Sequence, residues 1–88
     1  MRVIISPRAE KQLKKIPKID QIAVVKKIRQ IRDERIPEQT EKLKGFPDIF
    51  RTMVGDYRIV FKRNSKDIYI VLIHHRRDVY RLLNQLLR

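Results

Sequence analysis

The feature that most constrains the fold is a change of hydrophobic period near residue 49. From there to residue 73, apolar residues recur at every second position or fill a whole segment, and the run is broken at Gly55-Asp56 and at residues 64–67. A period of two is typical of strands, and a two-residue turn with glycine is typical of a hairpin. The sequence therefore predicts three consecutive antiparallel strands, over residues 49–54, 57–63 and 68–73.

The first half of the chain has a different period. Residues 2–5 are predicted to form a short strand, and Ser6-Pro7 supplies an N-cap followed by proline in the first helical turn. Apolar residues then recur at helical spacing until Pro17, which ends the predicted first helix. The residues of this first apolar face are Ala9, Leu13 and Ile16.

A second helix is predicted over about residues 19–35, and its apolar face is expected to run through residues 19, 22, 25, 28 and 31. Residues 37–44 are polar and are predicted to form a loop, and Asp78 is positioned to cap a short last helix over residues 79–87. The fold class is therefore α+β. One small domain is expected, with a strand and helical hairpin packed on one face of a mainly antiparallel sheet and a short C-terminal helix.

Turn length fixes which strand residues share a face, because directly opposed residues point the same way. A two-residue turn pairs Arg51 with Val60 and Met53 with Arg58. The second turn is expected to pair Arg63 with Ile68, Arg58 with Ile73 and Val60 with Val71. The predicted core face carries Val54, Tyr57, Ile59, Phe61, Ile68, Ile70, Leu72 and the alternating His74. The opposite face is predicted to carry Arg51, Met53, Arg58, Val60, Lys62, Tyr69, Val71, Ile73 and His75.

The chain is strongly basic, with a net charge of +12. Residues 1–45 carry 13 basic and 6 acidic side chains, and residues 46–88 carry 9 and 4, so the charge belongs to the whole domain rather than to a tail. Such a field favours polyanionic partners such as nucleic acid. The absence of cysteine excludes disulfides and thiolate chemistry. No segment is predicted to span a membrane, so a soluble, cytoplasmic protein is expected.

Arginines gathered on one sheet face suit phosphates, because a guanidinium offers forked donors and stays charged. RNA can be cut without a metal, if a base takes the 2′-hydroxyl proton and cations stabilise the charged phosphate. The sequence has neither metal-ligand spacing nor a glycine-rich phosphate loop, so no metal or cofactor is expected. The residues expected to contact RNA are Lys44, Lys62, Tyr69, Arg77 and Arg81.

The stretches "KLKGFPDIFRTMVGDYRIVF" and "IVLIHHRRDVY" resemble the RelE toxins of type II toxin–antitoxin systems, within the RelE/ParE superfamily. The resemblance covers essentially the whole chain. It implies an mRNA interferase that enters the ribosomal A site and cleaves mRNA to leave a 2′,3′-cyclic phosphate. By this resemblance, Arg51, Arg58 and Arg76 stabilise the phosphate and leaving group, and Tyr80 orients the substrate.

One departure from the family concerns the general base. Met53 stands where well-known members carry a second lysine, so Tyr80 or His75 is left as the candidate base. Two other functions stay open, a ParE-like gyrase inhibitor and a non-catalytic module that binds RNA or the ribosome. The partners implied are an acidic RelB-like antitoxin, the 70S ribosome with mRNA, and a larger toxin–antitoxin assembly on operator DNA, with no membrane partner.

Overall fold

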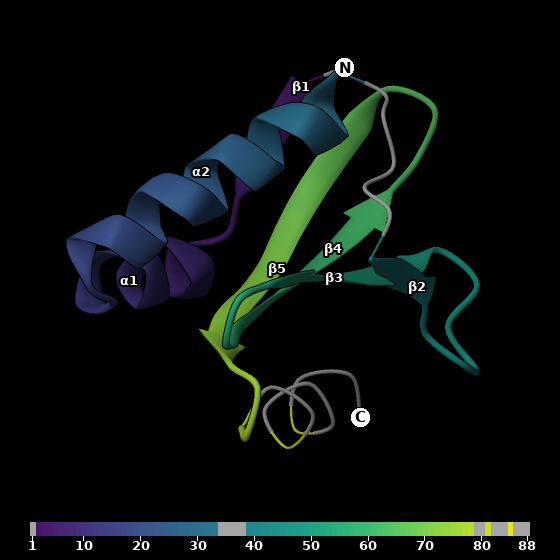
Figure 1. Cartoon of the computed structure of the whole chain (residues 1–88). Coiled ribbons are helices and arrows are strands. Elements are labelled where there is room, and N and C mark those ends of the chain that lie inside the picture. Colours follow the sequence, from purple (N-terminus) through teal and green to yellow (C-terminus); the bar gives the residue numbers. More distant parts are fainter. Residues whose placement is uncertain (1, 34–38, 79–80, 82–84, 86–88) are drawn as a thin grey trace.

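A computed structural model describes residues 2–33, 39–78, 81 and 85. Two helices lie together on one side of a five-stranded mixed sheet, and neither of them covers the opposite side (Figure 1). The predicted α+β class, with a helical hairpin on one face, is confirmed. No helix in the described part of the chain is both long and apolar enough to cross a membrane.

The N-terminal elements are strand β1 (Arg2–Ile5) and helix α1 (Pro7–Lys15). Ser6 caps the helix, since its side-chain oxygen accepts a hydrogen bond from the backbone N–H of Ala9 at 3.0 Å. The same hydroxyl donates to the backbone oxygen of Val71 in the sheet at 2.9 Å. The predicted cap is confirmed, and it also joins the start of α1 to the sheet.

Helix α2 (Lys18–Arg32) buries only the second half of the predicted face. Ile28 and Ile31 are buried as predicted, together with Val24, whereas Ile19 and Ile22 are 82 % and 61 % exposed. The predicted face advanced by three residues at each step. Three residues turn the helix by about 300° rather than 360°, so four such steps carry the stripe about two thirds of the way around it.

The sheet has the strand order β1-β5-β4-β3-β2. Its other strands are β2 (Thr40–Lys42), β3 (Ile49–Val54), β4 (Tyr57–Arg63) and β5 (Asp67–His75). β1 runs parallel to β5, and the remaining neighbours are antiparallel. The prediction of a loop over residues 37–44 was wrong for β2, a short polar edge strand that lacks the apolar pattern by which strands are predicted.

The β3–β4 hairpin has the predicted register, with Arg51 opposite Val60 and Met53 opposite Arg58. Gly55 begins its turn with φ of +57°, a left-handed conformation that glycine adopts without steric cost. Both observations confirm the hairpin that the two-residue turn predicts.

The β4–β5 pair follows the predicted register only over half its length. Arg63 pairs with Ile68 as predicted, but a β-bulge between Val60 and Phe61 shifts the pairing by one residue. The predicted pairs Arg58–Ile73 and Val60–Val71 are therefore wrong: Arg58 lies opposite His74, and Val60 opposite Leu72. One extra residue on β5 moves every later side chain of that strand to the other face.

Each face of the sheet has an apolar cluster. The larger lies under the helices and includes Ile73, which the bulge turns to this side. The smaller comprises Ile49, Val60 and Leu72 and is packed against Leu43 and Phe46 from the β2–β3 connection. The second face is therefore partly covered near the middle of the sheet, and Arg51 borders this apolar cluster because it lies opposite Val60.

Candidate phosphate-binding site on the sheet

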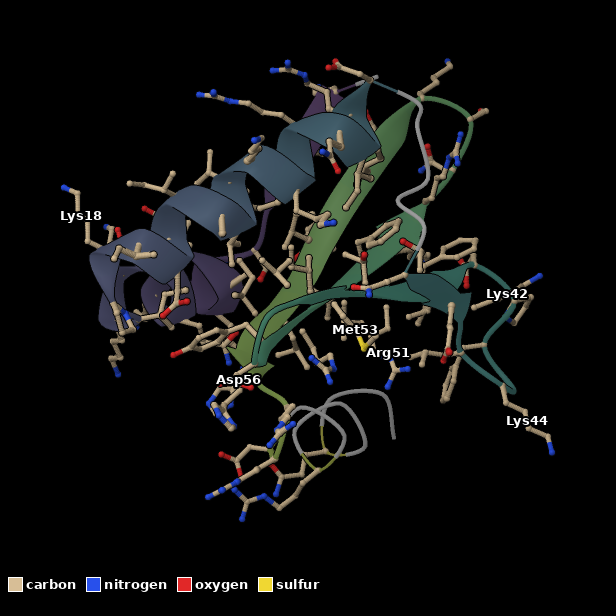
Figure 2. All side chains as sticks on the ribbon, viewed as in Figure 1. Lys18, Lys42, Lys44, Arg51, Met53 and Asp56 are labelled. Atoms are coloured by element: carbon tan, nitrogen blue, oxygen red, sulfur yellow. The ribbon has the colours of Figure 1, made fainter. Side chains whose placement is uncertain are left out.

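Three arginines lie near one another on or beside the face of the sheet that α1 and α2 leave uncovered, and we call them the arginine cluster: Arg51 in the middle of β3, Arg58 near the start of β4 and Arg76 in the turn after β5. Arg51 and its neighbour Met53 point to the side of the sheet away from α2, and the turn at Asp56 lies further along the hairpin, beyond Met53 (Figure 2). Three separate segments of the chain therefore supply the cations of the cluster.

The pKa of the Arg58 guanidinium reflects the charges that surround it. Partial burial lowers the pKa of its guanidinium, and the positive charges of Arg51 and Arg76 lower this pKa further. The carboxylate of Asp56 acts in the opposite direction. An arginine keeps its charge under such a shift, so the cluster is a concentrated positive field.

Each arginine of the cluster is held by a neighbouring acceptor. Arg58 Nη1 donates to the backbone oxygens of Gly55 and Tyr57, at 3.2 and 3.0 Å. The Arg76 backbone N–H donates to the Asp56 backbone oxygen at 2.8 Å, and its Nε lies 3.9 Å from Asp56 Oδ1. The hairpin turn thus orients two of the three cations.

The third member, Arg51, is held from the edge of the sheet. Its Nη2 donates to Glu41 Oε2 at 2.6 Å, and its side chain is only 13 % exposed. Glu41 is 69 % exposed and lies on β2, directly opposite Arg51. The pair therefore sits at the border between the sheet and solvent, where an incoming anion can compete with the Glu41 carboxylate.

A row of three side chains crosses the sheet beside the cluster. Met53 on β3 lies opposite Arg58 on β4, and Arg58 lies opposite His74 on β5. His74 Nδ1 is 3.8 Å from Asp78 Oδ2. The sequence had placed His74 on the core face, and the bulge reverses that placement.

His75 occupies the opposite face from the one predicted. It pairs with Tyr57, and the two rings meet edge to face with centroids 5.7 Å apart. Both line a cavity of about 660 Å³ between α1 and the end of the sheet, together with Arg8, Lys11 and Lys15. The predicted grouping of His75 with Arg51 and Arg58 is therefore wrong, because the extra residue of the bulge turns the later side chains of β5 to the opposite face.

Lys62 and Tyr69 pair with each other on the face of the sheet away from α1 and α2. Lys62 is two residues along β4 from Val60, which lies opposite Arg51, so Lys62 is a diagonal neighbour of Arg51. Lys62 Nζ lies 3.4 Å from Asp48 Oδ2, and Tyr69 is 39 % exposed. Lys62 therefore lies beside Arg51 and four strand positions, roughly 13 Å, from Arg58.

The remaining predicted site residues lie on the rim or outside the described part. Lys44 points outward from the β2–β3 connection (Figure 2). Arg77 is exposed and its backbone N–H donates to His75 Nδ1 at 3.3 Å. Arg81 is exposed and its Nη2 lies 3.4 Å from Asp78 Oδ1. Tyr80 and most of the predicted helix over residues 79–87 lie outside the described residues.

Three residues of the site were missed from the sequence: Glu41, Asp56 and His74. Asp56 was interpreted only as a turn residue, and Glu41 fell within the predicted loop. Nothing in the sequence marks the bulge that brings His74 to this face, although the His-His doublet itself was noted. Within the described ranges, no group of three or more histidine and acidic side chains is arranged to hold a metal.

With this geometry in view, the fold was compared with solved structures. The RelE–RelB complex of Pyrococcus horikoshii contains a chain that is 29 % identical, with a TM-score of 0.72 over 85 % of this chain and 93 % of that one. The RelB–RelE antitoxin–toxin complex of Methanococcus jannaschii gives 22 % identity and 0.76, over 90 % and 96 %. The isolated RelE toxin of Escherichia coli gives 20 % and 0.74, over 98 % of both chains. The fold is that of the RelE toxins.

The sequence itself matches a family model over residues 3–80, and that model describes the ParE toxin of the type II toxin–antitoxin system parDE. The chain therefore belongs to this toxin family, within the RelE/ParE superfamily, and is the toxin of a type II toxin–antitoxin system. The expected resemblance to the superfamily is confirmed. Comparison with curated protein sequences gives no significant match.

Proposed function

We propose that this toxin is a ribosome-dependent mRNA endoribonuclease that cleaves in the A site and inhibits translation. The observation that carries the proposal is the arginine cluster, three cations from separate segments of which Arg51 and Arg76 both act electrostatically on Arg58. A concentrated positive field beside the sheet suits the phosphate of a single-stranded message. A gyrase inhibitor has no need for cations arranged around one phosphate.

In this mechanism the 2′-hydroxyl of one nucleotide attacks the adjacent phosphorus. The P–O2′ bond forms and the P–O5′ bond breaks, which leaves a 2′,3′-cyclic phosphate and a free 5′-hydroxyl. Arg51 and Arg58 stabilise the charge that accumulates on the phosphate oxygens, and Arg76 stabilises the leaving 5′-oxygen. No metal takes part, because guanidinium groups supply the positive charge.

A second function is favoured by one observation, the match of the sequence to the ParE family model. ParE-like toxins resemble gyrase inhibitors rather than nucleases. The structural relatives above are RelE toxins, and the arginine cluster fits RNA cleavage better. A module that binds RNA or the ribosome without cutting is the third possibility, and the product of the reaction separates it from the first.

The proposed partner that restrains this toxin is a RelB-like antitoxin. Two of the structural relatives are toxins in complex with RelB. An acidic segment complements a chain of net charge +12, and it would neutralise the arginine cluster when bound. The ribosome with its mRNA, and operator DNA bound by a toxin–antitoxin assembly, complete the proposed set of partners.

The experiment is to add purified toxin to 70S ribosomes programmed with a defined mRNA and to map cuts by primer extension. Cuts that require the ribosome and fall at the A-site codon are expected. The matched variants are Arg58→Ala within the cluster and Lys26→Ala on α2, outside it. Inhibition of gyrase supercoiling with intact mRNA would instead establish the ParE-like function.

A further inference from the structure

The proposed cleavage needs a group that accepts the 2′-hydroxyl proton near neutral pH. Arginine stays protonated at such pH, and the thioether of Met53 is not a base. Histidine is the side chain whose ordinary pKa suits the task. Of the two histidines, His74 is the one next to Arg58 in the Met53–Arg58–His74 row, at the sheet end where both histidines also line the cavity beside α1.

The imidazole of His74 is placed and oriented like a reactive group. Its Nδ1 is buried, makes no hydrogen bond, and lies 3.8 Å from Asp78 Oδ2. A third of the side chain remains exposed. A small movement of Asp78 would complete a hydrogen bond to Nδ1, and Nε2 would remain as the nitrogen able to accept a proton.

We propose that His74 is the general base of this toxin, an inference that rests on the proposed ribonuclease function. Neutral His74 takes the proton of the attacking 2′-hydroxyl on Nε2 as the P–O2′ bond forms. The P–O5′ bond breaks, and the leaving 5′-oxygen takes a proton from solvent. Asp78 is the positioning residue, since it lies against Nδ1 and stabilises the imidazolium that results.

Several charged groups surround His74, and the carboxylate of Asp78 lies 3.8 Å from its Nδ1. The ionisable groups facing His74 or lining the cavity beside it are Arg58 and Tyr57 on β4, Arg8, Lys11 and Lys15 on α1, and Asp56, His75, Arg76 and Asp78 at the sheet end.

The test is the single-turnover rate of mRNA cleavage on programmed ribosomes, measured from about pH 5.5 to pH 8.5, on either side of the ordinary histidine pKa. The wild-type rate is expected to rise with pH through this range. His74→Gln is expected to lower the rate by about 10²–10⁴-fold and to abolish the rise. The matched control is His75→Gln, the neighbouring imidazole on the opposite face, which should leave rate and pH profile unchanged.

Two further measurements keep the outcome specific. Ribosome sedimentation should show that His74→Gln binds as wild type does, and Asp78→Asn should reduce the rate while keeping the pH-dependent rise. If wild type cleaves and His74→Gln matches it in rate and profile, the assignment is wrong although the ribonuclease function stands. If His75→Gln carries the loss, the assignment is likewise wrong. If wild type does not cleave at all, the proposed function fails, and the assignment of His74 with it.

Discussion

Glu41 and Arg51 lie directly opposite each other on β2 and β3, and their side chains form an ion pair with 2.6 Å between Oε2 and Nη2. The strand that carries Glu41 has only three residues and forms the edge of the sheet. An exposed carboxylate thus holds a largely buried member of the arginine cluster. In the proposed function this carboxylate competes with the RNA phosphate for Arg51.

Removing the Glu41 charge should therefore strengthen RNA binding. Exposed ion pairs contribute about 0.2–1 kcal/mol, so Glu41→Gln is expected to lower the Kd for single-stranded RNA by up to about fivefold. Fluorescence anisotropy at low salt measures this, and the gain should shrink as salt screens the charges. Asp48→Asn, beside Lys62, is the matched control. An equal gain in that control would show that net charge alone is responsible.

Arg58 should be the most sensitive member of the arginine cluster, since it lies between Met53 and His74. Loss of one preorganised donor to a charged transition state costs about 10²–10³-fold in rate, and Arg58→Lys should lose nearly as much as Arg58→Ala because the fork is absent. Cleavage of ribosome-bound mRNA measures this. Lys26→Ala, at an exposed position of α2, should stay near wild type, and a loss of similar size in that variant would argue against a localised site.

Ser6 should matter more for stability than a surface serine does. It caps α1 and donates to Val71, at the position where the bulge adds a residue to β5. Ser6→Ala is expected to lower the free energy of unfolding by about 1–3 kcal/mol, the sum of a lost cap and a lost hydrogen bond. Urea denaturation measures the loss, and Ser6→Thr, which keeps the hydroxyl, should recover most of it. An unchanged Ser6→Ala variant would contradict this role.

Gly55 should tolerate other residues according to their left-handed propensity. Nothing lies within 4 Å of a Cβ built there, so only the φ of +57° opposes a side chain. Gly55→Ala is expected to cost about 1–2 kcal/mol, and Gly55→Asn less, because asparagine visits this region more readily. Thermal denaturation compares the two. Equal losses would mean that the backbone conformation is not the reason.

The parts of the fold that depend on local pattern were predictable. The hairpin at Gly55, the Ser6 cap and the helical hairpin follow from residue type and period. The bulge in β5 was not predictable. An apolar strand buried on both faces has no polar–apolar alternation, so its sequence does not show which side chains point to which face. That one residue decided which of His74 and His75 joins the arginines.

The candidate site was likewise predictable only in part. Arg51 and Arg58 were grouped correctly because a two-residue turn fixes their register. Lys62 and Tyr69 lie on the predicted face, Lys62 beside Arg51 and four strand positions from Arg58, and their role in RNA binding stays a prediction. Glu41 was missed because β2 forms by pairing with β3 and carries no hydrophobic signal of its own.

The most direct test of the account is the chemical nature of the cut mRNA end. Wild-type toxin is incubated with programmed ribosomes, and the 3′ end of the upstream fragment is examined before and after treatment with a phosphatase and with acid. The account predicts a 2′,3′-cyclic phosphate, which resists phosphatase until acid opens the ring, and no such fragment with Arg58→Ala. Intact mRNA in the presence of bound toxin, or a fragment ending in a 3′-hydroxyl, would contradict it.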